Sequence, residues 1–382
     1  MSDYPHNPFS ATDPQQHPVS DHSPVAPVAV RGPNNSIEEL IGATPLLRIA
    51  KNHLPNHIRL YAKLEFCNPG GSVKDRTAAL MISCAERQGL LKPGGVIIEA
   101  TAGNMGLGIA AATAGKDYRL IFVVPTKFSS EKQTLLKAMG AEVINTPRAQ
   151  GMRGATAKAN RLLLEIPEAI SLRQFENPAN PLAHYYHTGP EIWQALQGQI
   201  DYLVAGAGSG GTFSGITRYL KEQNPGVQGI LADPEGSTIG GGEHAEYDIE
   251  GIGNDFVPLT LDMALVDAVI KVRDTEALAC VQQLAREDRL IVGSSSGAAV
   301  WAALQLAQDL ARATSTRQLR TSTDDTKPRI TPKRDGAPGS RITPKRDGAP
   351  PNNASARTSR TLNIVAVLPD RGDRYFSKLI FG

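Results

Sequence analysis

The sequence has few cysteines and no long apolar run. The first feature argues against a disulfide-rich or zinc-binding protein, and the second against a membrane-spanning one. The three cysteines, Cys67, Cys84 and Cys280, have a spacing that fits neither a disulfide framework nor a zinc site. No apolar run approaches the roughly 20 residues that a membrane-spanning helix needs. The first 36 residues also lack the apolar stretch of a signal peptide. We therefore expect a cytoplasmic protein that uses neither a membrane nor a metal ion.

Basic and acidic residues are nearly balanced over the whole chain, and only one segment has a clear excess of one sign. The chain has 40 Lys and Arg against 38 Asp and Glu, but residues 312–360 alone hold 12 basic residues and 4 acidic ones. This segment contains the decapeptide RITPKRDGAP twice, at 329–338 and 341–350, and a repeat with two prolines and one isoleucine cannot build a core. We predict a basic disordered insert over 313–360. Its charge also suits an anionic surface, but a solvated loop is the simpler interpretation, and we expect no nucleic-acid partner.

Glycine is abundant, with 36 residues, and short apolar runs alternate with helical patterns. Strands are predicted at 58–64, 96–98, 120–124, 143–144, 202–205, 230–232, 290–292 and 364–368. Helical patterns follow most of these runs, which is typical of buried parallel sheets. The prediction is an α/β fold with two subdomains, each with a mostly parallel sheet flanked by helices, and with ligands at the carboxyl ends of the strands.

The domain boundaries follow from composition. Residues 1–36, rich in Pro, His, Ser and Asp, are expected to be a disordered tail. A single core is then expected from 37–312 together with 361–382, with a smaller subdomain at about 77–180. The predicted insert joins a core helix to the last core strand.

Lys74 follows a turn rich in glycine, and a helical pattern begins at once after it. Gly70, Gly71 and Ser72 free the backbone before the lysine. The amino end of a helix carries a partial positive charge, which disfavours a second cation and favours a neutral, reactive amine. Most lysines after a turn are solvated surface residues, so this pattern alone does not establish chemistry.

Three glycine-rich turns between a strand and a helix offer places for a ligand. Residues 101–106 provide backbone N–H groups, a hydroxyl and an amide, which suit a carboxylate or a phenolate, although an ordinary capped turn has the same composition. Residues 206–212 suit a phosphate, because glycines let the backbone approach and the helix dipole attracts an anion. Residues 293–297 fit an N-cap cluster at least as well as a binding site.

Together these segments resemble the fold-type II pyridoxal-phosphate enzymes and, within them, the cysteine synthase and cystathionine β-synthase family. The resemblance covers about 37–310 and 363–381, which is nearly all of the chain outside the tail and the insert. It rests on these motifs, in chain order: 68–76, 101–106, 130–132, 174–181, 188–193, 208–212, 251–253 and 368–370.

The resemblance implies pyridoxal 5'-phosphate as the cofactor and gives each motif a role. Lys74 would bond the cofactor covalently and, once displaced by the substrate amine, remove the α-proton. Asn104 would hydrogen-bond the phenolic oxygen, and Ser295 would face the pyridine nitrogen. The phosphate would be held by Gly208, Ser209, Gly210, Gly211 and Thr212.

The same resemblance implies a small amino-acid substrate, a thiol nucleophile and a homodimer. The substrate would be held by Thr101, Ala102, Gly103, Met105, Gln174 and Gly251. Ala102 and Met105 stand where the family usually has hydroxyl residues, and the loss of such a hydroxyl removes a charge-assisted hydrogen bond of about 1.5 to 3 kcal/mol.

The implied reaction is β-replacement on an activated serine. O-acetylserine with sulfide would give cysteine and acetate, and this is the first expectation. The alternative is a cystathionine β-synthase that uses homocysteine, since the stretches 180–185, 233–237 and 250–256 look more like that branch. A specialised synthase of another β-substituted alanine is a third possibility, with Met105 reshaping the pocket.

Two other classes stay open from the residues alone. Residues 206–211 also fit the G-x-G-x-x-G dinucleotide fingerprint, with Asp233 as the ribose acid of an oxidoreductase, but the Lys74 turn would then have no role. An inactive relative that serves as a binding partner is the other class, motivated by Met105 and the basic insert. We interpret His184 as a packed, hydrogen-bonded histidine and not as a catalytic one.

Overall fold

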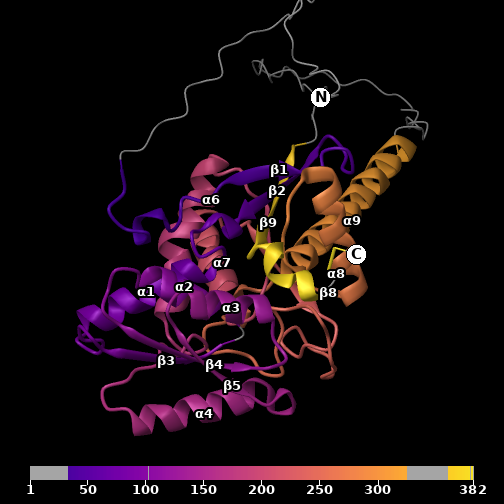
Figure 1. Cartoon of the computed structure of the whole chain (residues 1–382). Helices are drawn as coiled ribbons and strands as arrows, with labels where there is room; N and C mark the ends of the chain where they lie inside the picture. The colour runs from indigo at the N-terminus through magenta and orange to yellow at the C-terminus, as the bar shows by residue number, and fades with distance from the viewer. Residues whose placement is uncertain (1–32, 102, 325–359, 379, 382) are drawn as a thin grey trace, which may run out of the picture. The chain divides into compact units, whose positions relative to one another are not determined.

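Two sheets organise the chain in the computed structural model, which describes residues 33–101, 103–324, 360–378, 380 and 381 (Figure 1). The larger sheet has the strand order β1-β2-β9-β6-β7-β8 and the smaller one β3-β4-β5. The strands are β1 (Leu46–Ile49), β2 (Ile58–Leu64), β3 (Val96–Ala100), β4 (Arg119–Pro125), β5 (Glu142–Thr146), β6 (Tyr202–Gly206), β7 (Gln228–Pro234), β8 (Ala268–Val272) and β9 (Leu362–Leu368). Only β1 pairs antiparallel among these described strands, so the predicted α/β class with mostly parallel sheets is confirmed.

Helices alternate with these strands. The α-helices are α1 (Lys74–Arg87), α2 (Asn104–Ala112), α3 (Ser130–Ala138), α4 (Gly151–Glu165), α5 (Ala179–Ala183), α6 (Gly189–Ala195), α7 (Gly211–Gln223), α8 (Asp274–Gln283) and α9 (Ser294–Asp324). Shorter helical turns are η1 (Glu38–Leu40), η2 (Glu65–Cys67), η3 (Arg148–Gln150), η4 (His184–Thr188), η5 (Met263–Leu265), η6 (Leu284–Asp288) and η7 (Gly372–Lys378). None of the described helices is long and apolar enough to cross a bilayer.

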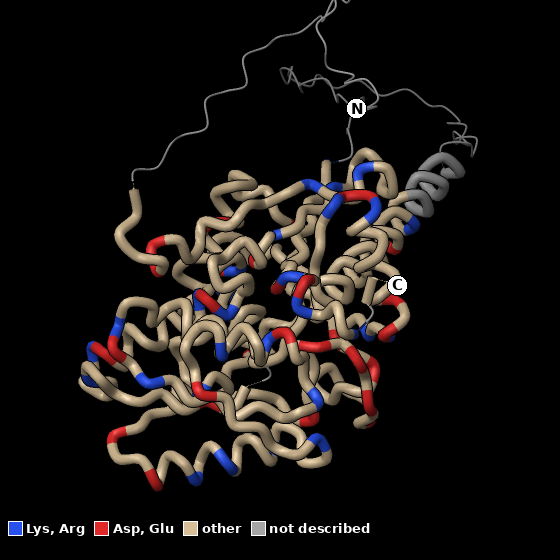
Figure 2. Tube along the Cα trace, viewed as in Figure 1, with Lys and Arg blue, Asp and Glu red and all other residues tan. Residues whose placement is uncertain are grey.

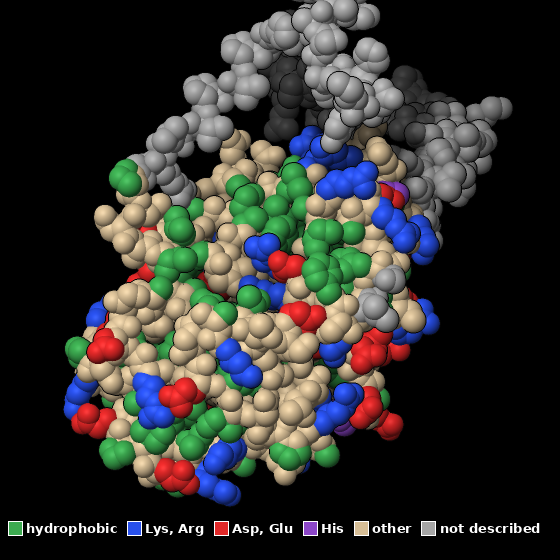
Figure 3. Space-filling view, in the orientation of Figure 1, with side chains coloured by type: hydrophobic (Ala, Val, Ile, Leu, Met, Phe, Trp, Pro, Cys, Tyr) green, Lys and Arg blue, Asp and Glu red, His purple; other side chains and the backbone are tan. Residues whose placement is uncertain are grey.

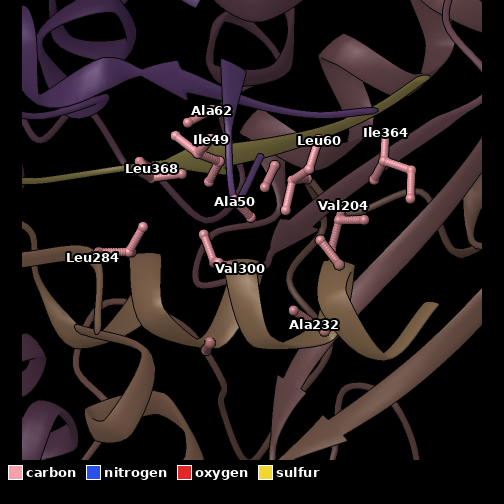
Figure 4. Packing of buried hydrophobic residues seen from close by; sticks show 14 of the residues in the cluster. Ile49, Ala50, Leu60, Ala62, Val204, Ala232, Leu284, Val300, Ile364 and Leu368 are labelled. Atoms are coloured by element: carbon pink, nitrogen blue, oxygen red, sulfur yellow. The ribbon is translucent and has the colours of Figure 1, made fainter. Parts of the chain in front are cut away.

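The larger sheet is buried on both faces because its strands alternate between two apolar clusters. Leu60, Val204 and Ile364 face α8 and α9, and Figure 4 shows Val300 pointing from α9 toward them. Their chain neighbours, such as Leu203 and Val365, pack on the other face against α6 and α7. This period of two is what a sheet covered by helices on both sides requires.

The smaller sheet repeats the arrangement. Ile98 and Ile121 pack against α4 on one face, while Ile97 and Phe122 pack against α1, α2 and α3 on the other. Figure 1 shows α4 alone beneath this sheet and the other three helices above it. The sheet lies within the range 77–180 that the sequence suggests for the smaller subdomain.

Strand β9 lies between β2 and β6 and runs parallel to both, with Leu368 opposite Leu64 and Ala366 opposite Val204. The carboxyl ends of β2, β9, β6 and β7 therefore meet at one edge of the sheet. The turn before Lys74, the residues after Leu368 and the loop after β6 all start from that edge. This is where ligands bind in open α/β sheets.

Three expectations about the elements differ from the structure. The apolar run at 290–292 was expected to be a strand, but only Val292 forms an isolated bridge, with Arg371. The sequence also gives no prediction for strands β1 and β8 or for helices α4, α5, α6 and α8. Helix α9 continues to Asp324, past residue 313 where the sequence suggests that the insert begins. The rest of that expected insert, 325–359, and residues 1–32 of the expected tail lie outside the described residues.

A buried group of charges fastens α1 to the larger sheet. The Arg76 guanidinium donates to Glu65 at 2.7 Å and to Glu191 at 2.7 Å, and Lys63 of β2 donates to Glu191 at 2.6 Å. Arg76 and Glu65 are both buried, with exposed side-chain fractions of 3% and 0%. Breaking such a pair leaves an uncompensated charge away from water, which makes each partner costly to remove.

We predict that Glu65→Gln lowers the free energy of unfolding by about 3 kcal/mol, because it leaves the buried Arg76 charge only partly compensated. Glu287→Gln is the matched control, since Glu287 pairs with His53 at 2.6 Å with both side chains nearly half exposed, and its loss should be below about 1 kcal/mol. Urea unfolding followed by circular dichroism measures both. Equal losses for the two variants would contradict the prediction.

Candidate active site

Lys74 is the first residue of α1 and lies at the carboxyl edge of the larger sheet. Gly71 in the preceding turn has φ +76°, a conformation that favours glycine. The turn is fixed to the chain that leaves β9: the Val73 N–H donates to the Pro369 carbonyl at 2.8 Å, and the Arg371 N–H donates to the Gly71 carbonyl at 3.3 Å. The amine is thus held beside the end of a central strand.

Lys74 is one of the residues that line a pocket at this edge. Its lining consists of Val73, Lys74, Ala205, Gly206, Gly208, Ser209, Gly210, Thr212, Gly251, Ile252, Val367 and Pro369. Burial lowers the pKa of the Lys74 amine to about 8, and the nearby Asp370 carboxylate opposes part of that shift. Near neutral pH a larger fraction of this amine is therefore in the neutral, nucleophilic form than in an exposed lysine, whose pKa is about 10.4.

The glycine-rich loop between β6 and α7 is packed so closely at two of its glycines that no side chain would fit there. A Cβ atom at Gly208 would lie 2.3 Å from the Gly251 carbonyl oxygen, and one at Gly211 would lie 2.1 Å from Asn180 Oδ1. Gly210 has φ +84° and is the N-cap of α7. The loop thus brings backbone N–H groups and the amino end of α7 to the pocket, which is an arrangement suited to phosphate.

Side chains behind the loop hold its hydroxyl groups. Asn180 Nδ2 donates to Ser209 Oγ at 2.9 Å. His184 is fully buried, and its Nε2 lies 3.2 Å from the hydroxyl oxygens of both Thr212 and Thr77. Burial lowers the pKa of His184 well below its ordinary value, so the ring is neutral and accepts at one nitrogen. The interpretation of His184 as a packed, hydrogen-bonded residue is confirmed.

The turn at 101–106 enters α2 and is shaped by Gly103, which has φ +125°. The Thr101 hydroxyl oxygen accepts from the Gly103 N–H at 3.0 Å, which leaves the hydroxyl hydrogen for another acceptor. Met105 is only 2% exposed, and its side chain belongs to the apolar cluster of the smaller subdomain. It therefore contributes packing and not a group that faces the pocket. Ala102 lies outside the described residues.

The other expected site residues lie near the pocket to different degrees. Gly251 lines it with φ +91°, and a Cβ atom there would be 3.9 Å from Ser295 Oγ, so Ser295 lies directly behind Gly251. Gln174 is buried, and its backbone carbonyl accepts from Asn180 Nδ2 at 2.7 Å. Several of the described site residues that the sequence predicts are not part of the pocket lining: Thr101, Gly103, Asn104, Met105, Gln174, Gly211 and Ser295.

The structure adds a group of residues to which the sequence gives no role. The Lys132 ammonium donates to Glu250 at 3.1 Å and to the Tyr375 hydroxyl at 2.8 Å, and it lies 4.0 Å from the centre of the Tyr375 ring. These contacts join α3 to the segment between β7 and η5 and to η7. Lys132 is the last residue of the motif 130–132, and membership of that motif is the signal in the sequence that points to this lysine.

The figures show how charge is distributed around this region. Blue Lys and Arg positions and red Asp and Glu positions alternate along the tube of Figure 2, and on the face that Figure 3 shows, side chains of both signs are scattered among uncharged ones. An extended single-sign patch is what a nucleic acid requires. The described part of this face presents mixed charge instead.

Comparison with known proteins gives consistent matches. A model of the family described as pyridoxal-phosphate dependent enzyme matches residues 37–316. The O-acetylserine dependent cystathionine beta-synthase of Bacillus subtilis (strain 168) is 42% identical over 345 residues, covering 90% of this chain and 97% of that protein. A cysteine synthase of Staphylococcus aureus (strain N315) is 42% identical over 282 residues, covering 73% of this chain and 91% of that protein. The crystal structure of the O-acetylserine dependent cystathionine beta-synthase from Helicobacter pylori superposes with a TM-score of 0.76 and 36% identity, covering 92% of this chain and all of that one.

The residues present fit pyridoxal phosphate. The cofactor needs an amine for its aldehyde, a phosphate cradle and a partner for its ring. Lys74 supplies an amine with a lowered pKa, and the loop that excludes a Cβ at Gly208 supplies the cradle, together with the hydroxyl groups of Ser209 and Thr212. We infer that Ser295 and Asn104 would serve the ring nitrogen and the phenolic oxygen.

The lowered pKa of Lys74 predicts how the cofactor-free protein takes up pyridoxal phosphate. Only the unprotonated amine attacks an aldehyde, so the binding rate should rise with pH through a midpoint near 8 and not near the ordinary 10.5. Stopped-flow measurement of the visible band over a range of pH gives this midpoint. Asp370→Asn should lower it further, because the carboxylate raises the pKa of Lys74. A rate that rises only near the ordinary pKa of lysine would refute the assignment.

Proposed function

Because the chain belongs to the family of pyridoxal-phosphate dependent enzymes, we propose that it replaces the acetate group of O-acetylserine with a thiol. The observation that carries the proposal is the Lys74 amine, with its lowered pKa, in one pocket with a phosphate-binding loop. The Bacillus subtilis and Helicobacter pylori relatives, which each cover at least 90% of this chain, are both named as O-acetylserine dependent, which supports this leaving group.

Lys74 is the base of the proposed reaction. When bound, the cofactor supplies an electron sink that stabilises negative charge on the α-carbon of an amino acid. The Lys74 Nζ atom takes up the α-proton, and a pKa near 8 suits this exchange at neutral pH. Overall, the bond from the β-carbon to the acetate oxygen breaks, a bond to sulfur forms, and the thiol proton balances the acetate that leaves.

The turn at 101–106 is proposed to hold the substrate carboxylate. The first N–H groups of α2 lack partners within the helix and lie at its positive end, and the Thr101 hydroxyl has a hydrogen to donate. The buried side chain of Met105 leaves those N–H groups uncovered. The absence of a hydroxyl at 105 is therefore compatible with O-acetylserine, and Gln174 and Gly251 complete the proposed site.

Two nucleophiles are supported by different relatives. Sulfide would give cysteine, as the name of the staphylococcal relative implies for that enzyme. Homocysteine would give cystathionine, as the names of the Bacillus subtilis and Helicobacter pylori relatives imply for those enzymes. Because the Bacillus subtilis relative keeps 42% identity over 90% of this chain and the staphylococcal one over 73%, we favour homocysteine over sulfide, which is the first expectation from the sequence.

The experiment measures acetate release and products from O-acetylserine with either sulfide or homocysteine. We expect cystathionine with homocysteine at a kcat/KM at least as high as that for cysteine with sulfide, and little product when serine replaces O-acetylserine. Lys74→Ala should lower kcat by several orders of magnitude, because both the covalent anchor and the base are lost. Equal turnover of serine, or no acetate release with either thiol, would overturn the proposal.

We also infer a homodimer in the cytoplasm. The three cysteines are unpaired, which suits a reducing compartment. Phe256, Val257 and Leu259 lie in one segment and are exposed by 47%, 48% and 81%, and such an apolar group is typical of an interface.

Light scattering on a sizing column tests the dimer. The unmodified chain should elute at twice the chain mass, and Leu259→Glu should shift it toward the monomer, because a charge would be buried in the interface. Leu164→Glu is the control, since Leu164 is 90% exposed on the separate helix α4. A monomer at all concentrations would contradict the inference.

A further inference from the structure

Asn104 lies between two buried charged residues whose role the sequence does not indicate. Asp370 follows β9 and is 1% exposed, and Arg374 lies in η7 and is 6% exposed, while Asn104 itself is partly exposed. Asn104 Nδ2 donates to Asp370 Oδ2 at 2.7 Å. At the other end of the amide, Arg374 Nη1 donates to Asn104 Oδ1 at 3.1 Å.

These two partners permit one orientation of the amide. A carboxylate only accepts hydrogen bonds and a guanidinium only donates them. If the Asn104 amide were flipped, its oxygen would face the Asp370 carboxylate and its NH₂ group would face the Arg374 guanidinium, so both charge-assisted bonds would be lost. The amide therefore has a fixed direction. One of its two N–H hydrogens is used by Asp370, and the second is left over.

The two charged residues are themselves anchored. Asp370 Oδ2 also accepts from the Tyr375 hydroxyl, which stays protonated because burial raises its pKa well above the ordinary value. Arg374 Nη2 donates to the Gly70 carbonyl, and the Arg374 carbonyl accepts from Ser129 Oγ at 2.7 Å. The same arginine thus ties Asn104 to the glycine turn that precedes the lysine.

We propose that Asp370 and Arg374 are positioning residues, which fix the Asn104 amide so that its second N–H donates to the phenolic oxygen of pyridoxal phosphate. This inference rests on the proposed cofactor site and concerns only cofactor binding. A merely structural alternative is that Arg374 holds the carboxyl-terminal segment in place without acting through Asn104.

A double-mutant cycle separates the two accounts. Arg374→Met, Asn104→Ala and the double variant are compared with the unmodified protein for their dissociation constants of pyridoxal phosphate and for the position and pH dependence of the visible band, without any substrate. We expect each single variant to weaken cofactor binding about tenfold and to shift the band. The double variant should be no worse than Asn104→Ala, because Arg374 acts through that amide.

Arg371→Met is the matched control, since Arg371 lies in the same segment and its side chain forms an ion pair with Asp373 at 3.0 Å, away from Asn104. It should leave the dissociation constant and the band unchanged. Asp370→Asn should reproduce the loss, because an amide at 370 either donates or accepts and no longer fixes the direction of Asn104. At a pH well above the Lys74 midpoint, where the effect of Asp370 on that amine no longer matters, it too should add nothing in the Asn104→Ala background.

Full additivity in the cycle would overturn the proposal in favour of the structural alternative. If Arg374→Met does not fold, Arg374→Lys replaces it, since lysine donates from one point and cannot serve both Asn104 and Gly70. An Arg374→Lys variant with unmodified binding and spectrum would also overturn the proposal. Failure of the unmodified protein to bind the cofactor would refute the proposed function itself, whereas additive losses in a protein that binds it would refute only this inference.

Discussion

The pairing of β9 between β2 and β6 is the constraint on which the rest of the structure depends. The last strand of the chain is central in the larger sheet, so the sheet is complete only when residues 362–368 are in register with both neighbours. Parallel register brings the end of β9 to the same edge as the loops after β2 and β6. The residues that follow, Pro369 and Asp370, are therefore delivered to the turn before Lys74 and to the amide of Asn104.

Burial at that edge sets the chemistry. Far from water, the Lys74 amine becomes easier to deprotonate, the His184 ring becomes neutral, and the Tyr375 hydroxyl keeps its proton. The same low polarity makes each unpaired charge costly, and so Lys132 is compensated by Glu250 and by a tyrosine ring. One physical condition thus produces a reactive amine and a rigid set of hydrogen bonds around it.

How far the sequence predicts this structure depends on how local each signal is. Strand β4 and the turn at Lys74 have local signals, because a continuous apolar run or adjacent glycines suffice to identify them. The apolar run at 290–292 carries a similar signal but pairs only through Val292, since its partner Arg371 lies beyond the end of β9. The contacts of Asn104 with Asp370 and Arg374 join residues 266 and 270 positions apart, and periodicity says nothing about such pairs. The inward orientation of Met105 likewise depends on packing that only the folded subdomain provides.

The position of β9 also explains why the chain tolerates a duplicated decapeptide in the connection between α9 and β9. The entropy cost of closing a loop grows only with the logarithm of its length, and each doubling costs about 0.6 kcal/mol. One copy accounts for ten of the residues 325–361, so its presence costs a fraction of that amount. The ladders that β9 forms with two neighbours fix its register independently of that length, since a slip by one residue would turn Ile364 and Ala366 away from α9. The site depends on that register, and so a longer connection leaves Asp370 and Arg374 where the chemistry needs them.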